Sequence, residues 1–264
     1  MSDFETQTTQ WPEPKDIFLL LLFTFMLLIF TPILLEQLQI LPMDSQWQLL
    51  LGECLIILPA IFYVQKKNLP LKLAFRFNKT NSKVVLLSFF MGFPLTLIFE
   101  EINLLIDTFI PMPEDIVTLY AQIFTANSVS EWLFLLITVV LFAGVFEEAI
   151  FRGLLQQVLE HDLDVTRAVL TTAFVFAFMH GNPFAVVQIV FLGVIIGVLA
   201  WRSDSVWPAV IVHATHNFIS IVLVNTSEEN LAFLNWHGHI NPAFLFIAIA
   251  FLYYLIREFY QVTE

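Results

Sequence analysis

The sequence has few charged residues and almost no cysteine. Charged residues make up 13% of its 264 positions, against about 25% in an average soluble domain, so a typical soluble enzyme is excluded. Cys54 is the single cysteine, which excludes an internal disulfide and suits a small core residue. Basic residues number 11 against 23 acidic ones. This balance argues against nucleic acid as a partner, because phosphate binding needs clustered basic charge.

Long hydrophobic segments dominate the sequence. Hydrophobic residues make up 58% of the chain, 29 of them phenylalanines, and the mean hydropathy is +0.81. A membrane span needs about 20 apolar residues. The pattern predicts an all-α polytopic protein with about eight transmembrane helices, embedded in the lipid bilayer as a single domain, 1–264. The spans are expected at 17–36, 47–65, 84–106, 132–152, 167–181, 184–201, 205–224 and 241–257.

The distribution of basic residues predicts how the spans are oriented. With an inside N-terminus, all 11 basic residues fall in cytoplasmic segments or the adjoining span ends, so both termini are predicted to be cytoplasmic. The polar residues 1–16 have no basic n-region, and 17–35 is therefore expected to remain as an anchor. Segment 107–131 is either an amphipathic surface helix or a simple connector. The expected location is a bacterial-type plasma membrane or an equivalent internal membrane.

The fourth span contains two adjacent acids. Charged side chains deep in a span are costly and need a partner or a function. Glu148 and Arg152 are four residues apart with the acid first, which places them on one helix face as an ion pair. Glu147 points about 100° away and has no local cation. It is a candidate general base or acid, unless both acids are simply solvated at the boundary.

Two further polar clusters lie on other spans. His180 closes the fifth span, and His213, His216 and Asn217 lie inside the seventh. His213 and Asn217 are four apart and share a face, so they can hydrogen-bond a developing anion or contribute to a metal site. Together the clusters supply what a hydrolase needs, although a proton-coupled transporter could also use them. Glu53 is an isolated acid of the second span and is interpreted as structural.

These clusters resemble the motifs of the CAAX-protease and bacteriocin-processing family of intramembrane proteases, also called CPBP or Abi. The family pattern E-E-x-x-x-R, F-x-x-x-H and H-x-x-x-N corresponds to EEAIFR at 147–152, FAFMH at 176–180 and HATHN at 213–217, in that order. The motif-bearing core is expected at about 132–225. The resemblance implies an endopeptidase that cuts a membrane-associated protein or peptide. A non-catalytic immunity or scaffold protein of the same fold is the alternative.

The resemblance also implies a role for each motif residue. Glu147 and His180 would activate the attacking water, His213 and Asn217 would stabilise the oxyanion, and Glu148 and Arg152 would support them. A metal-free mechanism is favoured because Asn is a poor zinc ligand, and zinc held by Glu147, His180 and His213 is the alternative.

The water-activating role constrains the fold, because Glu147 and His180 must then share one water molecule. The fourth span is therefore expected to extend to about Glu160. The fifth should be short, with its Gly181-Asn182-Pro183 turn lining a wet cavity.

Overall fold

The computed structural model describes residues 11–264, so most of the predicted cytoplasmic segment 1–16 lies outside the described residues. A helix occupies each of the eight expected spans. Seven are long and apolar enough to cross a membrane, by length and composition, whereas the eighth, Val165–Met179, is shorter, as expected. Apart from the fourth span, the helices at these positions are α1 (Pro14–Gln37), α2 (Trp47–Lys66), α4 (Ser82–Phe109), α9 (Val165–Met179), α10 (Val186–Ser203), α11 (Trp207–Val224) and α13 (Pro242–Val262).

The fourth span is one helical segment, Val129–Asp162, so it extends past Arg152 as predicted. It consists of five consecutive pieces, two of them π-helical. These are α6 (Val129–Leu135), η1 (Leu136–Phe142), α7 (Ala143–Glu148), η2 (Ala149–Leu155) and α8 (Gln156–Asp162). The wider π-helical turns were not predicted, and such turns occur often at functional sites.

Shorter elements connect the spans. They are α3 (Leu71–Ala74), α5 (Glu114–Phe124), α12 (Glu228–Leu231) and a hairpin of β1 (Asn235–Trp236) and β2 (His239–Ile240). The structure thus selects a helix rather than a simple connector for the segment 107–131. The spanning helices α4 and α9 begin at polar caps, since the side chains of Asn81 and Asp164 accept hydrogen bonds from backbone N–H groups of their first turns.

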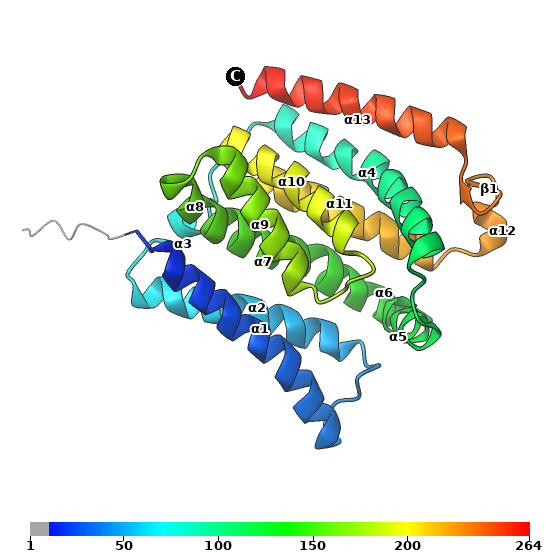
Figure 1. The fold of residues 1–264 in the computed structure, drawn as a ribbon, viewed down its shortest axis with the longest axis horizontal. Coiled ribbons are helices and arrows are strands. Elements are labelled where there is room, and N and C mark those ends of the chain that lie inside the picture. The colour runs from blue at the N-terminus through cyan, green and yellow to red at the C-terminus, as the bar shows by residue number, and fades with distance from the viewer. Residues whose placement is uncertain (1–10) are drawn as a thin grey trace, which may run out of the picture.

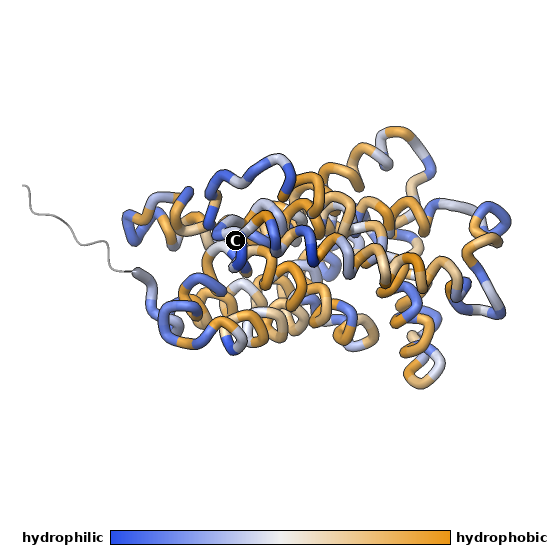
Figure 2. The backbone as a smooth tube through the Cα atoms, turned by 90° about the horizontal axis from the view of Figure 1, so that it is seen from above, coloured by the Kyte–Doolittle hydropathy of each residue, from blue (hydrophilic) through white to orange (hydrophobic). Residues whose placement is uncertain are grey.

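The helices lie side by side, with α1 and α2 along one edge and α4 and α13 along the opposite edge (Figure 1). The fourth span and α11 lie between them. Hydrophobic residues cover the lengths of the helices, and hydrophilic residues gather mainly in the loops at their ends (Figure 2). This distribution fits helices that pass through a lipid bilayer, where every backbone polar group must be paired within the helix.

Small residues allow α11 to approach its two neighbours closely. A Cβ atom placed on Gly92 of α4 would lie 2.5 Å from Cβ of Thr215, and one on Gly144 of α7 would lie 3.1 Å from Cβ of Ala214. Close packing through small side chains is the usual way in which membrane helices associate. Because Ala214 and Thr215 follow His213 directly, these contacts fix the depth and rotation of the HATHN motif.

Candidate active site

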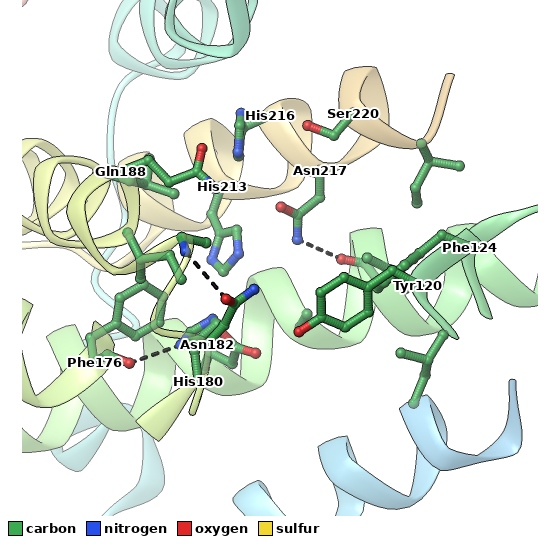
Figure 3. A pocket seen from close by; sticks show the side chains of 18 of the residues that line it. Tyr120, Phe124, Phe176, His180, Asn182, Gln188, His213, His216, Asn217 and Ser220 are labelled. Carbon is green, nitrogen blue, oxygen red and sulfur yellow. Dashed lines mark hydrogen bonds and ion pairs between the residues drawn. The ribbon is translucent and has the colours of Figure 1, made fainter. Parts of the chain in front are cut away.

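A cavity of about 440 Å³ lies between the helices and contains all four residues predicted to be catalytic. Its walls come from α2, α5, the fourth span, α9, α10 and α11. His180, His213, Asn217 and Tyr120 surround it in Figure 3, with Asn182 beside His180. The predicted Gly181-Asn182-Pro183 turn therefore lines the cavity through Asn182. Gly181 has φ +61°, a conformation that glycine adopts without strain.

Glu147 and His180 meet in this cavity although they come from different helices. His180 Nε2 lies 3.6 Å from Glu147 Oε2, well inside the range that a shared water requires. His180 Nδ1 lies 2.8 Å from the carbonyl oxygen of Phe176. A carbonyl can only accept, so Nδ1 carries a hydrogen and Nε2 is the nitrogen that faces Glu147. The extension of the fourth span and the shortness of α9 bring the two side chains to the same depth.

Glu148, Arg152 and His213 form a buried cluster beside this pair. Arg152 Nη1 lies 2.9 Å from Glu148 Oε2, and His213 Nδ1 lies 2.7 Å from Glu148 Oε1. Glu148 and Arg152 are fully buried. Arg152 Nη2 also donates to the Gly193 carbonyl at 3.1 Å, and its guanidinium lies 4.3 Å from the centre of the Phe176 ring. The predicted ion pair is present, and it also orients His213.

Asn217 and His216 are held by different neighbours. Asn217 Nδ2 donates to the Val139 carbonyl at 2.8 Å, within π-helical η1, and its second N–H remains for another partner. His216 Nδ1 lies 2.9 Å from Thr96 Oγ1, whose own hydrogen goes to the Gly92 carbonyl at 2.8 Å. His216 therefore donates to Thr96 through Nδ1. His213, His216 and Asn217 all line the cavity, and His216 also joins α11 to α4.

The cavity includes residues that sequence reasoning missed. Glu53, interpreted above as structural, lines it from α2. It is 8% exposed, and its Oε2 has no hydrogen-bond partner. A charged residue within an apolar span was the available signal. Tyr120 and Gln188 also line the cavity. Burial raises the pKa of the Tyr120 hydroxyl, so this group stays a hydrogen-bond donor at neutral pH.

The zinc alternative assigns the metal to Glu147, His180 and His213. Within residues 11–264 no three His, Cys, Asp or Glu side chains form a group that could hold a metal ion. Glu148 binds Nδ1 of His213, which leaves Nε2 without a partner among these contacts, and the Val139 carbonyl accepts one N–H of Asn217. The polar groups of the cavity comprise a carboxylate and an imidazole, from Glu147 and His180, and two potential N–H donors, from His213 and Asn217.

Comparison with known proteins supports the resemblance seen in the motifs. Residues 129–219 match the family model described as type II CAAX prenyl endopeptidase Rce1-like. No curated protein and no solved structure matches the chain. The matched segment begins with the fourth span and ends within α11, so it contains all three motifs. Residues 129–219 are thus similar to an Rce1-like CAAX prenyl endopeptidase domain, in a chain whose described residues form seven helices long and apolar enough to cross a membrane.

Proposed function

We propose that this chain, which carries the Rce1-like domain over residues 129–219, is an endopeptidase that cleaves a membrane-held protein by means of activated water. The observation that carries this proposal is the 3.6 Å approach of His180 Nε2 to Glu147 Oε2 inside the cavity. A neutral imidazole nitrogen and a carboxylate are both acceptors. A water between them can donate one hydrogen to each, which turns its lone pair toward the substrate carbonyl.

The reaction would then proceed by general base catalysis. Glu147 accepts a proton as the water oxygen forms a bond to the carbonyl carbon, giving a tetrahedral oxyanion. Breakage of the C–N bond releases the amine, which takes the proton from Glu147, and leaves a new carboxylate. No other reactant is required, because water supplies both the oxygen and the protons.

His213 and Asn217 would stabilise the oxyanion. Asn217 has a free N–H for this purpose. His213 gives its Nδ1 hydrogen to Glu148, so Nε2 can donate only when the ring is an imidazolium. With that charge, the Glu147 and Glu148 carboxylates and the Arg152 and His213 cations balance to zero. Glu148 and Arg152 would therefore support catalysis by orienting His213 and balancing its charge.

The substrate would be a protein held at the membrane by a lipid group. The matched family is described as prenyl endopeptidases of CAAX proteins, which makes a farnesylated peptide with three residues after the cysteine the first probe. The scissile bond would enter the cavity between the Glu147–His180 pair and the donors on α11.

The test is a cleavage assay in detergent with wild type and Glu147→Gln, with and without a chelator. General base catalysis contributes roughly 10²–10⁴-fold, so the variant should lose at least about a hundredfold in rate. Glu100→Gln is the matched control, because Glu100 belongs to the other adjacent acid pair of the chain and does not line the cavity.

Three results would count against the proposal. Equal cleavage by wild type and Glu147→Gln would contradict the role of Glu147. Loss of activity with the chelator and its recovery with zinc would favour the metal alternative. Binding of the probe without any cleavage would favour the non-catalytic alternative.

A further inference from the structure

Glu53 is a cavity residue that the mechanism above does not use. It lies on α2, outside the matched segment 129–219, yet it lines the same cavity as Glu147 and His180. Its neighbour Cys54 lines a separate apolar groove between α1 and α2. The Glu53 side chain is thus directed toward the cavity. An apolar side chain at this position would cost less free energy to bury.

The Glu53 carboxyl group is buried without compensation. The residue is 8% exposed, and its Oε2 has no hydrogen-bond partner within the described chain. Glu148, by contrast, is fully buried but contacts Arg152 and His213. Burial of a carboxyl without a partner costs free energy, and an ionisable residue inside a membrane protein usually faces a substrate path or a partner.

The charges around the cavity indicate the chemistry of that partner. Among the described residues that line it, two are acidic, Glu53 and Glu147, and none is Lys or Arg. Arg152 is fully buried and already bound to Glu148 and Gly193, and the His213 imidazolium of the proposed mechanism is bound to Glu148. A second negative charge in this space therefore has no cation of the protein to balance it.

We propose that Glu53 is a specificity-determining residue that binds a basic side chain of the substrate near the scissile bond. This inference rests on the proposed function, because it assigns a part of the substrate to the same cavity. A Lys or Arg entering the cavity would supply the cation that Glu53 lacks. It would hydrogen-bond the unpaired Glu53 oxygen through a charge-assisted contact. An acidic side chain at the same place would be rejected by both carboxylates.

The inference limits where the basic residue stands in the substrate. An extended peptide covers about 3.3 Å per residue, and Glu53 lies in the same cavity of about 440 Å³ as the reacting pair. The basic residue should therefore lie within a few positions of the cleaved bond. A lysine farther along the peptide should have no effect on binding.

Binding rather than cleavage provides the test, so that its outcome does not depend on turnover. The probe is a set of farnesylated peptides in which each position in turn carries Lys, acetyl-lysine or Asp. Binding is measured to Glu147→Gln and to Glu147→Gln/Glu53→Gln. Glu147→Gln/Cys54→Ser is the matched control on the same helix.

The expected result is a preference for Lys at one position. The Lys peptide should bind Glu147→Gln roughly tenfold or more tightly than the acetyl-lysine peptide, because a desolvated charge pair is lost. The preference should vanish in the Glu53→Gln background and persist with Cys54→Ser. The comparison of Lys with acetyl-lysine peptides uses the Glu147→Gln protein, in which Glu53 is unchanged. The test can therefore be made even if the Glu53→Gln variant does not fold.

Two outcomes would overturn the inference. The first is equal binding of Lys and acetyl-lysine peptides at every position. The second is a Lys preference that survives Glu53→Gln, which would place the cation elsewhere. Failure of the proposed function would be seen in the cleavage assay instead. The wild-type protein would then cleave none of these peptides, including those that it binds.

Discussion

Replacing Glu148 by Gln tests the buried cluster that orients His213. Glu148 and Arg152 have no solvent exposure. Arg152 Nη1 approaches both carboxylate oxygens, at 3.0 and 2.9 Å. A glutamine keeps one acceptor oxygen but removes the negative charge. Arg152 would then have no carboxylate partner and would retain only neutral contacts, namely the amide oxygen, the Gly193 carbonyl and the face of the Phe176 ring.

The size of the effect follows from burial. Breaking a buried ion pair by removing one partner costs about 3–5 kcal/mol, because the remaining charge has no compensation. We therefore expect Glu148→Gln to lower the free energy of unfolding by about that amount. Arg167→Gln is the control, because Arg167 pairs with Asp164 while 75% exposed, and exposed pairs contribute about 0–1 kcal/mol.

Reversible unfolding in mixed micelles, followed by circular dichroism, measures these differences. The double variant Glu148→Gln/Arg152→Met should be less destabilised than the sum of the single variants, because it leaves no uncompensated charge. A loss for Glu148→Gln no larger than that for Arg167→Gln would refute the reasoning. Strict additivity in the double variant would show that the two side chains do not depend on each other.

Three other changes probe the catalytic donors, the helix packing and the orientation. Asn217→Ala should lower kcat by roughly 10²–10³ with little change in KM, as for the loss of one oxyanion donor; an unchanged kcat in steady-state assays would remove Asn217 from that role. Gly92→Ala should cost about 1–3 kcal/mol through overpacking, because its Cβ would meet Thr215 at 2.5 Å, whereas Gly52→Ala, with no atom within 4 Å, should not destabilise the micelle-unfolding transition. In a Cys54→Ser background, Lys79→Cys should react with a membrane-impermeant thiol reagent only from the cytoplasmic side, and His237→Cys only from the opposite side of the membrane. Labelling of both cysteines from the same side would contradict the predicted topology.

Much of the fold could be read from local sequence. Apolar segments predicted the position of every spanning helix, because the bilayer requires about 20 apolar residues for each crossing. The i, i+4 spacing predicted the Glu148–Arg152 pair, which is present at 2.9 Å. Helical periodicity also separated Glu147 from that pair. The motif order predicted the Rce1-like domain, which the family match confirms. The roles of these residues, and the cytoplasmic location of both termini, stay predictions.

Other features were not accessible from local patterns. The π-helical pieces η1 and η2 have no sequence signature of their own, yet η1 presents the Val139 carbonyl that holds Asn217. The contact of His213 with Glu148 was also not predicted, because the two residues lie on different helices. Glu53 was interpreted as structural, since nothing near it in the sequence indicates what its side chain faces.

By itself, then, the sequence determined which segments are helices, that Glu148 pairs with Arg152 one turn away and which residues are candidates for the chemistry. These properties depend on hydrophobic length and on spacing along one helix. The tertiary structure decided which side chains share a cavity. Glu147 meets His180 because the fourth span is long and α9 is short, and α11 holds His213 and Asn217 at that depth because Gly92 and Gly144 allow it to pack closely. Such contacts depend on how helices fit together, and that fit is a property of the whole assembled bundle.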